Sequence, residues 1–292
     1  GIITSKWPTD CVAAAAIDVG IFERIDVADL SIDFTLADHN VVSFSSSQLT
    51  AKLISVGFNW PVTESSQHAN FEHDGNVVAT GNTISSPATF ANGIISTTVQ
   101  KTSLEIHPTF FGIAMASIIS LPKVNLTIRG TVDATLSTNA PFIPKSFKVS
   151  GIGYEAPTTL KGCANFPNIV FQSQVSLTVD PATGVYTLTA QINVPNPSQL
   201  IMTLGDLTFQ LVDTTNLVVG TVLLTSVQLN MKNNQLKATI KITNKSTYDA
   251  LLIGPVTFTM KGFADTSTNP VLVTAFNSLK TPFTIPKLTP AA

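Results

Sequence analysis

The stretch VNLTIRGTVD, which runs from Val124 to Asp133, occurs again as VTFTMKGFAD from Val256 to Asp265. Valine, threonine, glycine and aspartate occupy the same four positions, and three further positions exchange similar residues. The copies lie 132 residues apart (256 − 124), and PFIPK at 141–145 is matched by PFTIPK at 282–287. So long a period indicates one duplicated domain rather than a solenoid of short repeats. We therefore predict an N-terminal segment with a short helix (1–24), followed by two repeats, 25–155 and 156–292.

The polar character of this chain comes from neutral side chains rather than charged ones. Only 12% of its 292 residues are charged, against about 25% in typical soluble domains. Threonine, which favours strands, occurs 39 times. The formal net charge is −2, and no basic cluster is present to meet the phosphates of a nucleic acid. This composition predicts an extracellular or cell-surface protein and argues against a nucleic-acid partner.

Apolar and polar residues alternate along most of the chain, as they do in half-buried strands. The main alternating segments are Leu30–Leu36, Ile169–Val179, Tyr186–Val194, Leu207–Leu211, Val227–Met231, Leu236–Ile242 and Val256–Met260. Turn-forming residues separate such segments at Asp74-Gly75, Asp180–Gly184 and Asn233-Asn234. Short alternating strands with turns at close intervals predict an all-β fold, which we interpret as two tandem β-sandwiches.

Two segments are predicted to be helical. The first, VAAAAIDV at 12–19, follows the capping candidates Thr9 and Asp10 and precedes Gly20, a suitable C-terminal stop. The second is the apolar run that begins at Phe110, directly after His107-Pro108, because proline is favourable at a first helical position. We expect a buried helix across one end of a sandwich, with a strand as the alternative. No apolar run reaches the roughly 18 residues of a membrane span.

The two cysteines, Cys11 and Cys163, lie 152 residues apart (163 − 11). This spacing excludes a local metal clip and leaves two alternatives, a disulfide or two buried free thiols. The extracellular character of the composition favours the disulfide. Such a bond would join the N-terminal segment to the junction between the repeats.

The sequence contains one cluster of potential metal ligands, formed by His68, Glu72, His73 and Asp74. The two histidines are five residues apart, so they would not share a helix face, and we expect a solvated loop rather than a metal site. No Gly-x-Ser-x-Gly elbow is present, and neither cysteine neighbours a histidine in the sequence. The sequence therefore predicts no catalytic residues, no metal and no cofactor.

Two sequons for N-linked glycosylation are present, Asn125-Leu126-Thr127 and Asn244-Lys245-Ser246. Asn125 has the better support, because its neighbours Val124 and Leu126 are predicted to face the core. In a strand, that places the Asn125 side chain on the solvent side.

Several motifs together resemble a known group of proteins. In the second half, NVPNPS (193–198), LGDLTFQL (204–211) and NLVVGTVLL (216–224) resemble late-embryogenesis-abundant type-2 domains. Over most of the chain, the motif order is similar to that of an uncharacterised fungal family related to this domain. The motifs are FNWPVT (58–63), DGNVVATG (74–81), SPAT (86–89), NLTIRGTVD (125–133) and TLKGCANF (159–166). The resemblance implies tandem fibronectin-like sandwiches and a secreted or membrane-facing placement, and it transfers no catalytic residues.

Together these patterns favour a non-enzymatic extracellular or cell-wall-associated structural or adhesive protein. Self-assembly into a homo-oligomer or fibre would use edge strands or the N-terminal segment. The first alternative is a hydrophobic-ligand (lipid) binder, and the second is a glycan-binding module, although three Tyr and two Trp offer few aromatic platforms. The lipid alternative requires an apolar cavity. Its lining would come from five residues, Phe110, Phe111, Met115, Ile118 and Ile119. Simple filling of the core also explains these residues.

Overall fold

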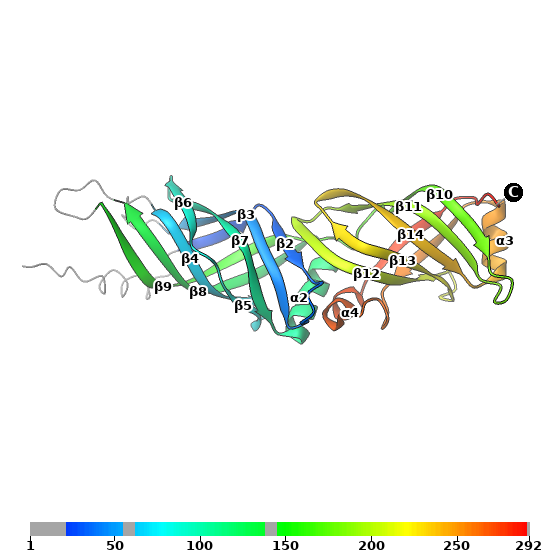
Figure 1. Ribbon diagram of the computed structural model, residues 1–292, viewed down its shortest axis with the longest axis horizontal. Helices are drawn as coiled ribbons and strands as arrows, with labels where there is room; N and C mark the ends of the chain where they lie inside the picture. The colour runs from blue at the N-terminus through cyan, green and yellow to red at the C-terminus, as the bar shows by residue number, and fades with distance from the viewer. Residues whose placement is uncertain (1–21, 55–61, 138–144, 291–292) are drawn as a thin grey trace, which may run out of the picture. The chain divides into compact units, whose positions relative to one another are not determined.

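The computed structural model describes residues 22–54, 62–137 and 145–290 (Figure 1). Strands dominate this part of the chain and its three helices are short, so the all-β prediction is confirmed. The helix predicted at 12–19 lies outside the described residues. Contacts divide the chain into two compact units. Unit 1 comprises 1–32, 40–110 and 125–160, and unit 2 comprises 33–39, 111–124 and 161–292.

Strands β1 to β9 form most of unit 1. Their pairing order is β2-β3-β7-β5-β4-β8-β9, with β1 paired to β3 and β6 paired to β4 and β7. Their bounds are β1 Phe22–Val27, β2 Leu30–Asp33, β3 Val41–Leu53, β4 Val62–His73, β5 Asn76–Asn82, β6 Ser86–Ala91, β7 Ile94–Ile106, β8 Lys123–Ser137 and β9 Ser146–Lys161.

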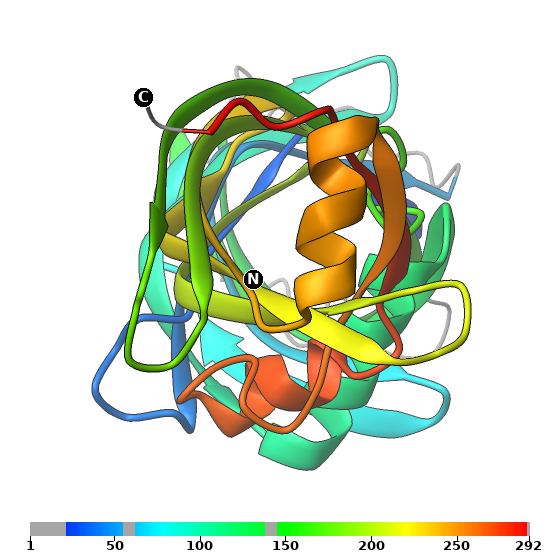
Figure 2. The ribbon, with the colours of Figure 1, turned by 90° about the vertical axis from the view of Figure 1, so that its right-hand side faces the viewer.

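Unit 2 contains strands β10 to β16, in the pairing order β10-β11-β14-β13-β12-β15-β16. Their bounds are β10 Val170–Val179, β11 Tyr186–Asn196, β12 Leu200–Val212, β13 Val218–Leu229, β14 Lys232–Ile242, β15 Val256–Lys261 and β16 Lys280–Ile285. Most of α2 (Pro108–Ser120) groups with this unit, which also holds α3 (Lys245–Ile253) and α4 (Pro270–Phe276). Figure 2 shows the strands of unit 2 as a ring, with α3 lying across the end nearest the viewer.

The two units share one strand order. In unit 1 the path β1-β3-β7-β5-β4-β8-β9 matches the path β10-β11-β14-β13-β12-β15-β16 of unit 2, pair for pair. In both units a helix follows in the sequence at the same place: α2 connects β7 to β8, and α3 connects the corresponding strands β14 and β15. The sixth strands, β8 and β15, are the repeated stretches from which the duplication was inferred. Strands β2 and β6 have no counterpart among the described residues of unit 2, and helix α4 has none among those of unit 1.

The glycine shared by the repeated stretches has the same physical role in both. A methyl group on Gly130 would clash with the carbonyl oxygen of His68, and one on Gly262 would clash with that of Phe276. Each glycine therefore permits a close approach of two backbones that a side chain would prevent. The shared position reflects packing rather than chemistry.

The repeated strands turn the expected faces toward the core. Ile128 and Met260 are 4% and 1% exposed, which confirms both as core residues. Arg129 is exposed, as predicted, whereas Lys261 is only half-exposed. Asn125 is exposed beside the buried Val124, so the predicted outward orientation of this asparagine is confirmed.

Two predicted turns are confirmed by their backbone geometry. At the β4–β5 hairpin, Asp74 and Gly75 have φ values of 49° and 77°, the pair of left-handed residues that a type I′ turn needs. After β10, the carboxylate of Asp180 accepts hydrogen bonds from the Thr183 hydroxyl (2.7 Å) and the Ala182 amide (2.9 Å). These bonds, that of Thr183 foremost, lower the pKa of Asp180. Gly184 completes the turn with φ 68°.

The alternation predicted for β10 does not hold along its length. Leu177 is buried, but Val175 and Val179 are 59% and 50% exposed. The pairing with β11 shifts register at 171–173 and at 174–176, and each bulge reverses the side that later residues face. β10 also ends the strand path of unit 2, so it borders only one paired neighbour.

The turn predicted at Asn233-Asn234 is wrong. Both residues lie within β14, and the chain reverses earlier, at Asn230 and Met231. Met231 is therefore 39% exposed rather than part of the core. Asn234 is buried, because its side chain bonds to backbone groups rather than forming the turn.

Helix α2 confirms the helical interpretation of the apolar run after His107, with Pro108 as its first residue. It packs within unit 2, where Phe34 and Phe111 lie 6.0 Å apart between ring centroids. Gly112 lies so close to Thr274 of α4 that a methyl group there would clash. The backbone amide of Cys163 donates to Ile118 O (2.7 Å) near the end of the helix, and that of Asn165 donates to Ile119 O (2.7 Å).

Candidate functional site

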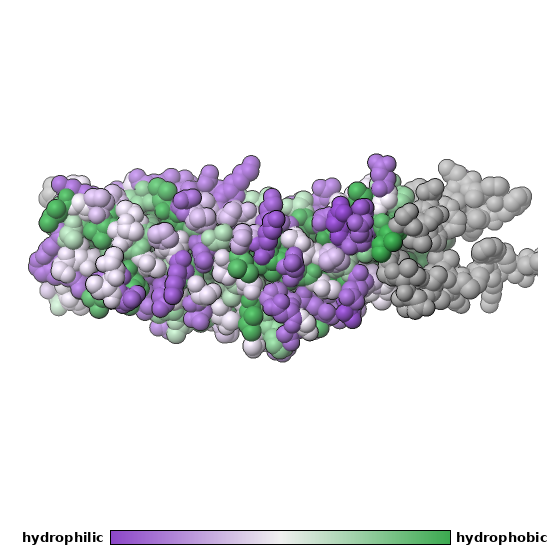
Figure 3. All heavy atoms as spheres, turned by 180° about the vertical axis from the view of Figure 1, so that it is seen from behind, coloured by the Kyte–Doolittle hydropathy of each residue, from purple (hydrophilic) through white to green (hydrophobic). Residues whose placement is uncertain are grey.

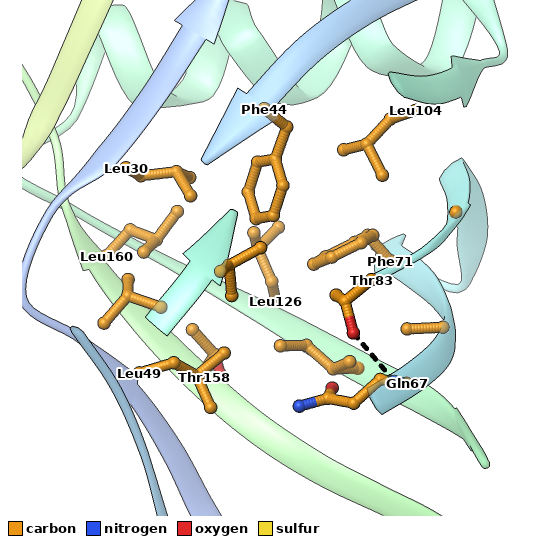
Figure 4. Close-up of a pocket in the computed structure, with 15 residues that line it drawn as sticks. Leu30, Phe44, Leu49, Gln67, Phe71, Thr83, Leu104, Leu126, Thr158 and Leu160 are labelled. Atoms are coloured by element: carbon orange, nitrogen blue, oxygen red, sulfur yellow. Dashed lines mark hydrogen bonds between the residues drawn. The ribbon is translucent and has the colours of Figure 1, made fainter. Parts of the chain in front are cut away.

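The interior of unit 1 is an apolar core rather than an open binding chamber. Figure 4 shows the side chains that converge there, and the void between them measures about 40 Å³. Small-molecule sites usually enclose roughly 300–1,000 Å³, so this void has room for water-sized groups only. Its principal apolar lining comes from Leu30, Phe44, Leu49, Leu104, Leu126 and Leu160.

Polar groups in this interior are paired with one another. The Thr83 hydroxyl accepts a hydrogen bond from the Gln67 backbone amide at 2.7 Å, and the Tyr154 hydroxyl donates to Gln67 Oε1 at 2.8 Å. Burial raises the pKa of Tyr154, so its hydroxyl keeps the proton that it donates. These contacts hold the side chains in place.

The first and last strands of unit 1 meet at a seam without a backbone ladder. The buried Thr158 hydroxyl of β9 donates to the carbonyl of Ile25 in β1 at 2.7 Å. Nearby, Phe22 packs edge-on against Tyr154, with ring centroids 5.2 Å apart. The two edge strands therefore face each other, which limits how far a partner strand could use them.

A polar groove of about 540 Å³ lies on the outer face of unit 1, over β4, β8 and β9. Arg129 of β8 runs along it, with Nε 3.4 Å from Glu72 Oε1 and Nη2 3.1 Å from Glu155 Oε2. The Arg129 side chain is 54% exposed, so each ion pair contributes at most about 1 kcal/mol to stability. Thr127 and Pro157 line the groove between these charges and Asn125.

The two sequon asparagines have different surroundings. Asn125 is exposed at the polar groove, and its Oδ1 accepts a hydrogen bond from the Thr159 hydroxyl at 2.9 Å. Asn244 is the N-cap of α3, where its Oδ1 accepts from the Thr247 amide at 3.1 Å and from the Ser246 hydroxyl at 2.6 Å. Glycosylation at either position stays a prediction.

The histidine cluster lies on a strand rather than in the predicted loop. His68, Glu72 and His73 belong to β4, where alternation turns the buried His73 to the face opposite the other two. His73 Nδ1 lies 3.6 Å from Asp74 Oδ2. His68 Nδ1 lies 2.5 Å from Asn82 Oδ1. Within the described ranges, no group of three His, Cys, Asp or Glu residues is placed to hold a metal ion.

Cys163 is a buried free thiol in the structure, and burial raises its pKa to about 12. A thiol with so high a pKa is protonated at neutral pH and is a poor nucleophile. Its predicted disulfide partner, Cys11, lies outside the described residues, so the disulfide stays a prediction. Cys163 Sγ instead lies 3.9 Å from Oδ1 of Asn196.

Asn196 is the centre of a buried polar network that the sequence reasoning missed. Its Oδ1 accepts from the Ser198 hydroxyl (2.6 Å) and amide (3.1 Å), and its Nδ2 donates to Leu200 O (2.8 Å) and Asn230 O (3.2 Å). Asn234 joins the network by donating to Val194 O and Asn230 O and accepting from the Asn230 amide. The NVPNPS motif was the available signal, because asparagine and serine beside prolines at a strand end suit such a backbone clamp.

The residues predicted to line an apolar cavity lie on α2. Phe111, Met115, Ile118 and Ile119 are buried, and Phe110 is half-buried against His107, with ring centroids 4.4 Å apart. None of them lines either the unit 1 void or the polar groove. A ligand cavity at α2 stays a prediction. No helix in the described ranges is long and apolar enough to span a membrane.

Comparison with known proteins gives a family of unknown function. Residues 79–211 match the family model described as "Protein of unknown function (DUF3712)". No curated protein matches the chain. Among solved structures, the chain is similar to a protein of unknown function from Porphyromonas gingivalis W83, at 10% identity and with a TM-score of 0.17, covering 89% of this chain and 97% of that one. A TM-score this low carries no argument about fold or function.

Proposed function

We propose that this chain is a non-enzymatic structural or adhesive protein, placed outside the cell or in the cell wall, that self-assembles. The observation that carries the proposal is the pair of units with one strand order, of which the first is closed around an interior with only about 40 Å³ of free space. A void of this size leaves the outer surface of unit 1, rather than its interior, for a function. Figure 3 supports a surface role, since hydrophilic and hydrophobic side chains are interspersed over the face it shows.

The chemistry of the described residues also argues against an enzyme. The one described thiol, Cys163, is buried and protonated. Glu72 and Glu155 each form an ion pair with Arg129 on the outer face of unit 1. An enzyme needs a group whose pKa suits proton transfer or attack at the working pH.

A relation to late-embryogenesis-abundant type-2 domains, and with it a fungal, secreted source, forms part of this proposal. The range matched by the family of unknown function, 79–211, contains five of the motifs that carry the resemblance. These are SPAT (86–89), NLTIRGTVD (125–133), TLKGCANF (159–166), NVPNPS (193–198) and LGDLTFQL (204–211).

Contacts at the terminal strands of each unit limit the possible routes of assembly. In unit 1, Thr158 joins β9 to β1, and in unit 2 the Gln174 side chain of β10 bonds to both backbone groups of Thr289, after β16. Because the terminal strands of each unit are occupied in this way, edge-to-edge pairing has less free backbone to use. We therefore favour assembly through the N-terminal segment.

Sedimentation velocity of the purified chain over a range of concentrations tests the proposal. We expect multimers whose size grows with protein concentration and which disappear when residues 1–20 are removed, while the folded circular-dichroism spectrum is retained. A chain that stays monomeric at every concentration would contradict the self-assembly that the proposal requires. Multimers that survive the truncation would keep the function and exclude the N-terminal route.

The hydrophobic-ligand alternative gains no support from unit 1, because a void of about 40 Å³ is far below the size of a ligand site. It depends instead on α2, where Phe111→Asp would expel a bound lipid without changing the oligomeric state. The glycan-binding alternative has one candidate place, the polar groove.

A further inference from the structure

The outer face of β8 presents three polar side chains in line along the polar groove. Asn125, Thr127 and Arg129 occupy alternate positions, so all three project from the same face of the strand. Their register is fixed by β4, where Glu72 pairs with Thr127. On the other side, the Thr159 hydroxyl of β9 bonds to Asn125.

This row coincides with a glycosylation sequon. Asn125 and Thr127 are its first and third residues, so the acceptor amide and the sequon hydroxyl both border the groove. The described hydrogen bond of Asn125 uses Oδ1 and leaves Nδ2, the atom that a glycan would modify, outside that contact. The side chain is exposed, and the groove provides about 540 Å³ directly beside it.

The groove has the chemistry of a sugar-binding surface. Carboxylates accept hydrogen bonds from hydroxyl groups, and the guanidinium of Arg129 donates them in a fixed fork. The contacts with Glu72 and Glu155 hold that fork over the groove. Pro157 adds an apolar surface against which the C–H face of a sugar ring can lie.

We propose that Asn125 carries an N-linked glycan whose first sugars lie in this groove, over Thr127 and against Arg129 and Glu155. In the transfer, Nδ2 bonds to the anomeric carbon of an oligosaccharide carried on a lipid diphosphate. The bond from that carbon to the diphosphate oxygen breaks, the amide loses one proton, and the lipid diphosphate leaves, with no change of oxidation state. The inference rests on the extracellular placement in the proposed function, because the chain must meet this donor.

The second sequon provides a matched control. Asn244 caps α3 through its Oδ1, and it does not line the polar groove. A glycan on Asn244 would start at the N-terminus of α3 and would not lie in the polar groove. Lys261 serves as a second control, since it is the repeat counterpart of Arg129 in unit 2.

The experiment uses the full chain produced in a host that N-glycosylates secreted proteins, with glycopeptide mass spectrometry to identify occupied sites. Release of each glycan from the folded protein by an endoglycosidase then reports how far it is shielded. We expect Asn125 to carry a glycan. This glycan should be released about tenfold faster in Arg129→Ala, because a glycan bound in the groove can be cleaved only while it is dissociated from the groove. Lys261→Ala should not change the release rate of the Asn125 glycan. Neither Arg129→Ala nor Lys261→Ala should change the release rate of a glycan on Asn244.

Three results would overturn the inference. If Asn244 is glycosylated and Asn125 is not, the proposed glycan in the groove is wrong, while the extracellular placement still holds. Equal release rates in the parent protein and in Arg129→Ala would show a glycan that does not contact the groove. An unmodified Asn125 together with binding of added oligosaccharide, lost in Arg129→Ala, would assign the groove to a glycan-binding module instead. Thr127→Ala, which removes the sequon and keeps Asn125, checks that any mass increment is N-linked.

Discussion

Helices α2 and α3 stand at the same place in the two repeats, yet they are buried to different extents. When SLPKV (120–124) is aligned with LIGPV (252–256), Ile119 corresponds to Leu251, and both are fully buried. The difference lies in the other residues of the same helix face. There, the buried Phe111, Met115 and Ile118 of α2 correspond to Thr243, Thr247 and Ala250, none of which is buried.

The comparison shows that the two repeats share one buried helix residue and differ in the residues around it. Both helices keep one anchor in the core, but on α2 further residues of the same face are buried within unit 2, where Phe34 contacts Phe111 and α4 contacts Gly112. On α3 the corresponding residues are not buried, and Lys245 pairs with Asp249 at 2.7 Å on its surface. We therefore interpret α2 as a packing element of unit 2 and α3 as a helix that is held to the core mainly by Leu251.

The largest expected effect tests this difference between the helix faces. Met115→Ala should lower the free energy of unfolding by about 2–5 kcal/mol, because it leaves a cavity at a residue that is 1% exposed. Thr247→Ala, its counterpart on α3, should cost less than about 1 kcal/mol. Urea unfolding of the full chain measures both. The control pair, Ile119→Ala and Leu251→Ala, should show equal losses, and equal losses from Met115→Ala and Thr247→Ala would break the comparison.

The buried polar network of unit 2 should give the next largest effect. Asn196→Ala removes the bonds to the Leu200 carbonyl and the Ser198 hydroxyl and one of the two side-chain bonds to the Asn230 carbonyl, which should cost about 1–3 kcal/mol. Asn193→Ala, in the same motif, removes only one 3.3 Å contact to Asn233 and should cost less than about 1 kcal/mol. Thermal unfolding of the two variants decides between them. A smaller loss from Asn196→Ala would show that the network does not clamp this strand end.

The strands were predictable where one face is continuously buried. Leu188, Ile192 and Ile240 lie on such faces, and the period of two was sufficient to identify them. In β10 the bulges reset the period, and a bulge leaves no mark in a hydrophobicity pattern. The turn at Asn230 and Met231 was not predicted, because Asn234 was interpreted as a turn residue. In the structure its buried side chain bonds to the backbone of Asn230.

The polar groove was only partly predictable for a similar reason. The outward orientation of Asn125 follows from alternation within one strand. Glu72, Arg129 and Glu155 come together because β4 and β9 flank β8, and a single sequence gives no measure of which strands become neighbours.

A smaller effect compares the seams of the two units. Thr158→Val keeps the shape of the buried side chain but removes the bond to Ile25, so the free energy of unfolding should fall by about 1 kcal/mol. Gln174→Ala removes two partly exposed bonds to Thr289 and should cost about half as much. Hydrogen exchange of β1 and β10 should rise in the corresponding variant only. Faster exchange in both units from one substitution would show that the seams are not independent.

The smallest effect is the pH dependence contributed by two turns of unit 2. Hydrogen bonds from Thr183 and Thr215, together with backbone amides, lower the pKa values of Asp180 and Asp213. A depressed pKa contributes stability that is present above the unfolded value, near 3.8, and is lost as pH falls through the folded value. The melting temperature of Asp180→Asn should therefore fall less than that of the parent protein below about pH 4. Parallel curves for the two proteins would contradict this assignment.

A native mass spectrum of the protein isolated from its source tests the proposed structural role most directly. The account predicts multimers of the chain that carry glycan mass and no lipid-sized increment. A strictly monomeric protein that carries a lipid-sized mass increment would contradict it, and would assign the chain to hydrophobic-ligand binding.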